Sequence, residues 1–559
     1  MSPAPGHLRL GGILLKNGFV READLAKAME IQQQQSRRPL GDILLELRLV
    51  SEENLGEALS QQLDIPFVQL NNYLIDPAVT SVLPEELARR LEVVPLFLVE
   101  NSLTLAMTDP ANLEVIDQVR FKTGCQVNPV ISTPSDILNT INQLYGRQDE
   151  VEALIEARAA AEPREAEMEA SLDLVQGAPV VRLVNQILAQ AIRSRASDIH
   201  LEPGEAGLRV RDRIDGILRD EPVVSKELQP AVLSRIKILS GMDIAERRIP
   251  QDGRIQVVLD GRPIDLRVSS FPTIYGEKIV LRVLDKGALV LALTDLGFLP
   301  DTLARYRTVI QRPNGILLVT GPTGSGKTST LYGTLLELNS PSTNIVTLED
   351  PVEYRLSGIT QGQANPRVGF SFASGLRSIL RQDPDIILVG EIRDRETAEV
   401  AVQAALTGHL VLSTLHTNDA PGAVTRLLDM GIEPFLVAST VIGVLAQRLV
   451  RRLCTSCREA FSPAEGLAAW QGEPPSQLFR GRGCRQCGGT GYRGRVGIYE
   501  LMVPSESIRG LILRHASASE VRTQAVSEGM RLMMDDGREK ALKGITSYDE
   551  VVRVAYQEE

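Results

Sequence analysis

The sequence predicts an α/β protein whose largest domain is built on a parallel sheet. Short apolar runs recur beyond about residue 293 and alternate with helical stretches; they lie at residues 316–319, 345–348, 386–389 and 410–412. Such runs, buried on both faces, are typical of parallel strands covered by helices. The first run leads into GPTGSGKT at residues 321–328, which fits the phosphate-binding pattern GxxxxGK[ST]. We therefore expect a RecA-like P-loop ATPase core.

The phosphate-binding loop has a clear chemical logic. Its glycines allow consecutive backbone N–H groups to face phosphates, Lys327 adds a positive charge, and the Thr328 hydroxyl can bind Mg²⁺. A helix predicted at residues 328–338 points its positive end at the same anion. The expected nucleotide-binding residues are Gly321, Pro322, Thr323, Gly324, Ser325, Gly326, Lys327, Thr328 and Ser329. The predicted ligands are ATP and Mg²⁺.

Length and composition limit the other possibilities. A chain of 559 residues suggests three or four domains. The net charge of −11 argues against nucleic acid as the main partner. No apolar run reaches the length of a membrane span; the nearest, residues 434–446, reads as a buried helix. The N-terminus also lacks the apolar core of a signal peptide. We expect a cytoplasmic protein that meets the membrane only through a partner.

The first 145 residues form an N-terminal regulatory or docking domain in this interpretation. Residues 1–65 contain a repeat of period thirty, in which Leu10-Gly11 returns as Leu40-Gly41. Two copies are too few for a solenoid and predict two small helical units packed on one another. Residues 66–145 change to a mixed pattern. The expected elements there are helices at 85–91 and 134–144 and strands at 93–99 and 102–107.

Two further segments precede the core. Residues 146–177 are rich in Ala and Glu with few large apolar side chains, which predicts a linker. Residues 178–286 begin with an amphipathic helix near residue 179 and continue with strands, such as 208–214 and 256–259, that end at Asp-Gly turns. They predict a separate α/β domain, followed by the ATPase domain at 287–559.

Three polar segments follow the phosphate loop at the ends of predicted strands, where open α/β sheets place their ligand sites. They contain Glu349-Asp350-Pro351-Val352-Glu353, a strand ending in Glu391, and Gly408-His409 through His416. Phosphoryl transfer needs carboxylates near Mg²⁺ and the attacking water, so Glu353 and Glu391 are candidates. Two alternatives stay open from the residues alone. Asp350-Pro351 also fits a helix start, and both histidines fit a strand core.

Taken together, GPTGSGKT, LEDPVEY, ILVGEIRD and TGHLVLSTLHT resemble the Walker A, Asp box, Walker B and His box of the secretion ATPase superfamily. Their order and spacing are similar to the branch that powers type II secretion and type IV pilus assembly, from about residue 178 to the end. The resemblance implies that Glu353 prepares the attacking water. It also implies that Glu391 serves the magnesium site with Thr328, and that His416 senses the γ-phosphate.

The domain at 178–286 resembles the PAS-like domain that precedes the core in this family, through SDIHLE at 197–202, RIPQDGR from 248 to 254 with Arg247 before it, and DLRVS at 265–269. Family members donate two arginines from it to the nucleotide, fifteen residues apart on neighbouring strands. Arg267 and Arg282 match that spacing, with Arg254 a third candidate, although surface ion pairing is an alternative. ATP would then draw two domains together across a hinge near residues 287–293.

Four cysteines form two CxxC pairs within residues 450–495. Cys454, Cys457, Cys484 and Cys487 stand with 26 residues between the pairs. In a chain expected in the reducing cytosol this spacing predicts a structural Zn²⁺ site rather than disulfides, with free thiols as the alternative. Cys125 is left unpaired and is expected to be buried. Assembly ATPases of the family are similar in carrying such a module.

The N-terminal repeat resembles the first half of a cyclic-di-GMP-binding domain found in some pilus and secretion ATPases. The candidate contacts are Arg9, Leu10, Gly11, Leu25 and Gln32 in the first copy and Leu40, Gly41 and Gln62 in the second. The second copy departs from the pattern, because Pro39 replaces the arginine and Arg48 replaces a glycine. The alternative, that the repeat only packs helices and docks a membrane partner, stays open.

The resemblance implies a homo-hexameric ATPase acting on an inner-membrane platform protein, peripheral at the inner face of the membrane, with no nucleic acid partner. Two other functions remain to be distinguished. A regulatory adaptor would bind nucleotide without turnover, which Lys327, Glu353 and Glu391 argue against. A conjugation-type DNA motor is disfavoured by the acidic balance.

Overall fold

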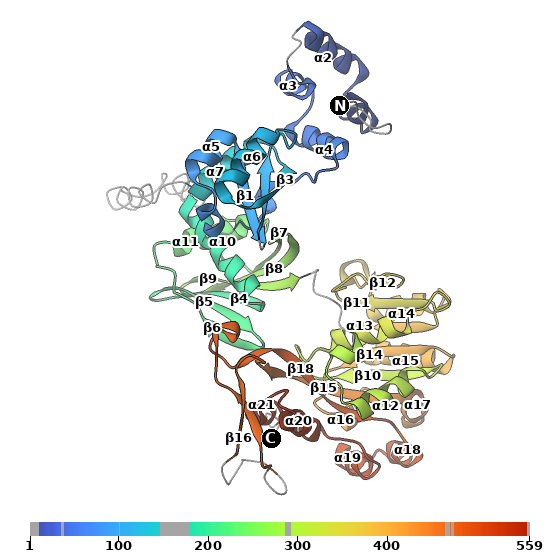
Figure 1. Ribbon diagram of the computed structural model, residues 1–559. Coiled ribbons are helices and arrows are strands. Elements are labelled where there is room, and N and C mark those ends of the chain that lie inside the picture. The colour runs from blue at the N-terminus through green and yellow to red at the C-terminus, as the bar shows by residue number, and fades with distance from the viewer. Residues whose placement is uncertain are drawn as a thin grey trace. The chain divides into compact units, whose positions relative to one another are not determined.

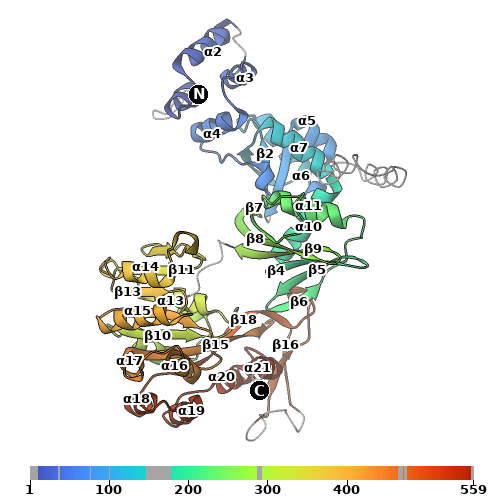
Figure 2. The same ribbon diagram turned by 180° about the vertical axis from the view of Figure 1, so that it is seen from behind.

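The structure, a computed structural model, describes residues 10–34, 38–75, 77–99, 101–145, 178–285, 292–463, 470 and 475–555. It divides into two compact units, Met1–Gly287 and Ala288–Glu559, which are described separately (Figures 1 and 2). The linker predicted at 146–177 and most of the hinge predicted at 287–293 lie outside the described residues. Among the described helices, none combines the length and hydropathy that a membrane span requires.

The N-terminal repeat folds as two helical pairs that share one core. The four helices are α1 (Leu10–Lys16), α2 (Glu22–Gln34), α3 (Leu40–Glu46) and α4 (Glu52–Leu63). A Cβ on Gly11 would lie 3.2 Å from Leu25 Cδ2, and a Cβ on Gly41 would lie 3.1 Å from Leu55 Cδ2. The same close contact therefore recurs thirty residues on. The repeated apolar positions meet in a single cluster, which confirms that the copies pack on one another.

The next part of the first unit is a small three-stranded sheet. Its strands β1 (Val93–Val99), β2 (Ser102–Met107) and β3 (Gln126–Ile131) pair in that order, the first pair antiparallel and the second parallel. Helices α5 (Glu85–Leu91), α6 (Leu113–Thr123) and α7 (Pro134–Tyr145) accompany the sheet. The two strands and two helices expected from the sequence are confirmed. Cys125 is buried in this core, as predicted.

A six-stranded antiparallel sheet completes the first unit. Its order is β6-β5-β4-β9-β8-β7. The strands are β4 (Ala196–Gly204), β5 (Gly207–Ile214), β6 (Ile217–Asp220), β7 (Gln251–Leu259), β8 (Arg262–Thr273) and β9 (Gly276–Asp285). Helices α10 (Ala178–Arg193) and α11 (Gln229–Leu239) bury apolar side chains against one face of this sheet. Side chains alternate along a strand, so the opposite face is left for polar residues.

The second unit is built on a seven-stranded sheet of order β12-β11-β13-β14-β10-β15-β18. All its pairings are parallel except that of β15 with β18. The strands are β10 (Gly315–Thr320), β11 (Ile345–Glu349), β12 (Thr360–Gln363), β13 (Ile386–Val389), β14 (Leu410–Leu415), β15 (Val441–Leu453) and β18 (Tyr492–Met502). The parallel α/β core expected from the apolar runs is confirmed.

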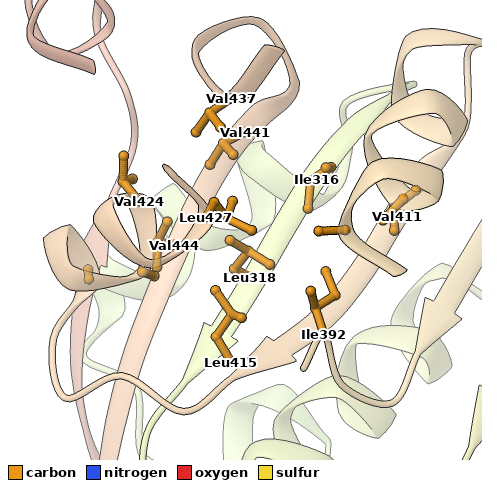
Figure 3. Packing of buried hydrophobic residues seen from close by; sticks show 14 of the residues in the cluster. Ile316, Leu318, Ile392, Val411, Leu415, Val424, Leu427, Val437, Val441 and Val444 are labelled. Carbon is orange, nitrogen blue, oxygen red and sulfur yellow. The ribbon is translucent and has the colours of Figure 1, made fainter. Parts of the chain in front are cut away.

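Helices cover both faces of this sheet. One apolar cluster joins the sheet to α12 (Pro300–Ile310) and α13 (Lys327–Leu338). The other joins it to α14 (Phe372–Ile379), α15 (Arg395–Leu406), α16 (Ala420–Asp429) and α17 (Pro434–Thr440). In Figure 3, Leu318 of β10 meets Leu427 of α16 and Val444 of β15 in this second cluster. The fully buried β10 is thus held from both sides with the phosphate loop at its end.

The expected buried helix at residues 434–446 is wrong in its second half. Helix α17 ends at Thr440, and the chain continues as β15, which lies between β10 and β18. Val441, Ile442 and Val444 favour a strand. A strand buried on both faces shows no polar alternation, so its pattern resembles that of a buried helix.

The rest of the second unit packs beyond β15 and β18. The segments β16 (Arg458–Phe461) and β17 (Leu478–Gly481) pair antiparallel and lead into the cysteine pairs. Four helices follow β18, namely α18 (Glu506–Leu513), α19 (Ala518–Ser527), α20 (Met533–Leu542) and α21 (Tyr548–Ala555).

Candidate nucleotide site and metal centre

The phosphate loop links β10 to α13, and its glycines are required by close backbone approaches. Gly321 has φ 147°, and a Cβ there would lie 2.5 Å from the carbonyl oxygen of Gln447. Gly326 has φ 90° and precedes the first residue of α13, Lys327. Thr328 and Ser329 follow in the exposed first turn. The N–H groups at this helix end point to where an anion would lie.

Lys327 folds back onto its own loop. Its Nζ donates to the carbonyl oxygens of Gly321, at 2.6 Å, and Pro322, at 3.0 Å. Burial lowers the pKa of Lys327 to about 8; the charge of Glu391 opposes this shift and that of Arg448 adds to it. A bound phosphate would supply the negative charge that the two carbonyls only partly replace.

Gln447 and Arg448, which sequence reasoning missed, support the loop from β15. The Nε2 of Gln447 donates to the Ser325 carbonyl oxygen at 2.8 Å, and its Oε1 accepts from Thr330 Oγ1 at 2.9 Å. The Gln447 residue is only 1% exposed. Arg448 is also buried and donates to Asn418 Oδ1 at 3.2 Å. The one available signal was a polar Gln-Arg pair inside the apolar run that we expected to be helical.

Glu391 and His416 come together at the carboxyl edge of the sheet. Glu391 follows β13 and His416 follows β14, its parallel neighbour. The His416 Nε2 lies 3.4 Å from Glu391 Oε2, and Arg393 forms an ion pair with the same carboxylate. Glu391 is largely buried, whereas the His416 side chain is half exposed. A partly buried carboxylate next to a phosphate loop suits a magnesium site.

The two histidines have different environments. His409 precedes β14, and its Nδ1 lies 2.9 Å from the Ala404 carbonyl oxygen and 3.1 Å from Thr407 Oγ1. The alternative of a structural histidine therefore fits His409 and is wrong for His416. The strand carries one histidine to each end, and only its carboxyl end lies at the loop.

The Asp box distinguishes a structural glutamate from Glu353. At the end of β11, Glu349 is buried, and its Oε2 accepts from the Tyr332 hydroxyl at 2.5 Å. Its Oε1 accepts from Thr347 Oγ1 at 2.6 Å. The Glu353 backbone N–H donates to the same Tyr332 hydroxyl at 3.3 Å, which fixes Glu353 beside α13. The helix start considered at Asp350-Pro351 is wrong, because residues 350–358 form no helix.

The candidate arginine fingers lie in one row across the antiparallel sheet. Arg267 on β8 pairs directly with Arg254 on β7 and with Arg282 on β9, so all three point to the same face. Arg254 bonds Asp265 Oδ2 at 2.6 Å, and Arg282 bonds Asp198 Oδ1 at 3.2 Å. Both side chains are more than half exposed, so these ion pairs are weak and exchangeable.

The four cysteines form a compact cluster that fits a tetrahedral metal ion. The Sγ atoms of Cys454 and Cys484 are 3.8 Å apart, those of Cys457 and Cys487 are 3.8 Å apart, and all lie within 4.8 Å of one another. Zn–S bonds of 2.3 Å at the tetrahedral angle place sulfurs about 3.8 Å apart, whereas a disulfide requires about 2.0 Å. The separations therefore match four thiolates around one ion.

The backbone around the cluster favours a thiolate at Cys487. Burial opposes its ionisation, but the N–H groups of Cys484 and Gly491 donate to Sγ at 3.1 and 3.2 Å and the pKa falls to about 6. Glycines permit this folding, since a Cβ on Gly483 would lie 2.3 Å from the Gly489 carbonyl oxygen. Thiolate is the form that binds metal.

The N-terminal candidate contacts are only partly described. Arg9 lies outside the described residues. Leu10, Gly11, Leu25, Leu40 and Gly41 belong to the helix packing, and Gln62 is half-buried on α4. Gln32 Nε2 donates to the Arg38 carbonyl oxygen at 3.1 Å. Arg48 adopts φ 53°, close to the 72° of Gly18 in the first copy, so the departure in sequence does not change the backbone turn.

Comparisons with known proteins agree with this geometry. The family model described as type II/IV secretion system protein matches residues 173–553, and the MshEN domain model matches residues 63–151, beyond most of the helical repeat. The type IV pilus assembly ATPase PilB of Myxococcus xanthus is 44% identical, covering 97% of this chain and 98% of its own length. The type II secretion system protein E of Xanthomonas campestris is 42% identical, covering 99% of each chain.

Among solved structures, the Legionella pneumophila ATPase DotB superposes with a TM-score of 0.50 at 24% identity, covering 66% of this chain and 94% of DotB. At this identity the likeness concerns the fold alone. The family match spans the six-stranded sheet, the phosphate loop, Glu391, His416 and the cysteine cluster. The chain therefore belongs to the type II/IV secretion system protein family.

Proposed function

We propose that this protein is an ATP-hydrolysing motor that powers assembly of a type IV pilus or a type II secretion pseudopilus. The observation that carries the proposal is the meeting of Lys327, Glu391 and His416 at one edge of the parallel sheet. A protein that only sensed nucleotide would not need a carboxylate and a histidine beside the phosphate loop. Full-length relatives are a pilus assembly ATPase and a type II secretion protein.

Each site residue has a role in this proposal. Lys327 and the loop N–H groups bind the β- and γ-phosphates, and Thr328 and Glu391 hold Mg²⁺, which neutralises developing charge when it is bound. Glu353 orients the attacking water. His416, hydrogen-bonded to Glu391, reports whether the γ-phosphate is present.

Movement comes from the domain before the core. We assign Arg267 and Arg282 as the arginines that reach the nucleotide phosphates, with Arg254 as a third contributor. Their alignment in one row supports a joint role. Loss of the γ-phosphate would release them, so that each hydrolysis changes the relation of two domains within a homo-hexamer. The fold of that domain is assigned as PAS-like.

The remaining parts set location and control. The cysteine cluster is assigned as a structural Zn²⁺ site, supported by its sulfur separations. The motor works in the cytoplasm, peripheral at the inner face of the inner membrane, by acting on a platform protein. The N-terminal domain is assigned to cyclic-di-GMP, supported by the MshEN match.

Phosphate release by the purified full chain tests the proposal. Wild-type protein should hydrolyse ATP with Mg²⁺, and Lys327→Ala should not, while Lys543→Ala, which alters an exposed lysine on the same unit, should behave as wild type. Absence of turnover by the assembled wild type would favour the adaptor, and strong stimulation by DNA would favour the conjugation-type motor. Deleting the gene and scoring surface filaments and exported enzymes separates pilus from secretion.

Calorimetry with cyclic-di-GMP tests the regulatory assignment. Binding should weaken at least tenfold in Gln32→Ala and stay unchanged in Gln118→Ala, which alters an exposed helix residue outside the repeat. No binding by the wild type would leave the repeat as a packing and docking element.

A further inference from the structure

A cavity lies between helix α10 and strand β5 in the first unit. Its volume is about 100 Å³, several times what one ordered water needs. The lining residues are Leu183, Gln186, Ile187, Gln190, Val210, Asp212, Glu221, Pro222 and Val224. Most of the wall is therefore aliphatic, and the polar groups are two carboxylates and two amides. None of these residues belongs to the proposed nucleotide site or to the cysteine cluster.

The Asp212 carboxyl group is buried in this wall without a matching donor. The residue is 1% exposed, and its Oδ1 makes no hydrogen bond within the described part of the chain. Burial, assisted by the charge of Glu221, raises the pKa of Asp212 to about 7. Glu221 itself accepts from Gln190 Nε2 at 2.6 Å. One carboxyl group of the cavity is thus held by the protein, and the other is left for something else.

The neighbouring arginines do not supply the missing partner. Arg211 and Arg213 flank Asp212 on β5 and so point to the opposite face of the sheet, where Arg211 pairs with Glu202 and Arg213 lies near Asp198. Arg219 stands opposite Asp212 in the β5–β6 pairing but forms no ion pair with it among the described residues. A buried acid without a cation costs free energy unless the structure returns it through a ligand.

We infer that this cavity binds a cationic nitrogen group on a short aliphatic stem, an alkylammonium or alkylguanidinium, with Asp212 as its principal acceptor. The stem would lie against Leu183, Ile187 and Val210, and the Glu221 carboxylate would add to the attraction at the polar end. Two sources share this chemistry: a free amine, and a lysine or arginine side chain of a partner protein. The inference does not depend on the proposed motor function.

Calorimetry on the full-length protein without nucleotide tests the inference, at pH 8 so that Asp212 can ionise. The probes are n-butylammonium, its neutral analogue 1-butanol, and Nα-acetyl-lysine amide, which stands for a protein side chain. We expect one n-butylammonium per chain and at least tenfold weaker binding of 1-butanol. Acetyl-lysine amide binding as well as n-butylammonium identifies a partner's side chain as the occupant. Rejection of the amide, with n-butylammonium retained, identifies a free amine.

Variants separate the site from non-specific effects. Asp212→Asn should weaken n-butylammonium binding at least tenfold, and Leu183→Phe should also weaken it by filling the aliphatic wall while both carboxylates remain. Glu205→Gln, at an exposed acid on the β4–β5 turn, should leave binding unchanged. Equal binding of amine and alcohol, unchanged affinity in a folded Asp212→Asn protein, or no binding heat in the wild type would each overturn the inference.

Discussion

The side-chain amide of Gln447 joins the phosphate loop to the strand beside it, because its Nε2 donates to the carbonyl oxygen of Ser325 at 2.8 Å. Its Oε1 accepts from Thr330 on the helix that follows the loop. One buried residue thus fixes both ends of the turn that would bind phosphates. This contact joins residues 122 positions apart in the chain.

Gln447→Ala should weaken nucleotide binding about tenfold. The change leaves the Ser325 carbonyl and the Thr330 hydroxyl without their partner in a buried site, which costs about 1–3 kcal/mol. The KM for ATP should rise more than kcat falls, since Gln447 acts on the loop and not on the reacting atoms. Thr330→Val removes only one of the two hydrogen bonds and should have a smaller effect. An unchanged KM in Gln447→Ala would show that the loop keeps its shape without this residue.

ATP affinity should fall as pH rises above about 8. The ammonium form of Lys327 binds phosphate, and its pKa in the free protein is about 8. Above this pH, binding must take up a proton, so Kd should rise up to tenfold per pH unit, while the nucleotide phosphates are already ionised. Titrations with a non-hydrolysable analogue in two buffers of different ionisation enthalpy measure that proton.

Lys327→Arg provides the matched control, because a guanidinium stays charged throughout this range. Its affinity is expected to be lower but independent of pH. The same pH slope in both proteins would assign the proton to another group.

The order of elements and the ligand edge of the core could be predicted from the sequence, because they depend on local patterns. The apolar runs at residues 345–348 and 386–389 became strands, and Glu391 followed its strand as expected. Long-range contacts could not be predicted. Nothing local distinguishes His409 from His416, and only the position of β14 in the sheet shows which one reaches the loop. Gln447 was missed for the same reason, since its partners lie on distant elements.

Arg267→Ala and Arg282→Ala should each reduce kcat by about 10³ or more while nucleotide binding changes only a few-fold. Arginines that stabilise transition-state charge have effects of this size. Arg209→Ala is the matched control, since Arg209 lies on the same sheet and its ion pair with Asp220 is exposed. Steady-state turnover and binding of a non-hydrolysable analogue would be measured on assembled protein. Wild-type turnover in Arg267→Ala would remove that residue from the proposed stroke.

Asp212→Asn should stabilise the protein at pH 8 relative to pH 4.5. The pKa of Asp212 is raised from 3.8 to about 7 in the folded state, so the folded chain holds a proton that the unfolded chain has lost between these values. Stability contributed at this position therefore falls as pH rises from about 4 to about 7. The variant lacks this term, so its Tm relative to wild type should increase over that range. A constant Tm difference would show that Asp212 ionises normally.

Cys454→Ser should lose one equivalent of zinc per chain, and Cys125→Ser should retain it. Cys454 supplies one of four sulfurs spaced for a single tetrahedral ion, whereas Cys125 is buried in the small three-stranded domain. Its position makes the consequence larger than the loss of an ion, because Cys454 directly follows β15, the strand that carries Gln447. Metal analysis measures the zinc, and ATP titration measures the loop. Full zinc occupancy in Cys454→Ser would refute the site, whereas lost zinc with unchanged ATP binding would restrict its role to the cysteine module.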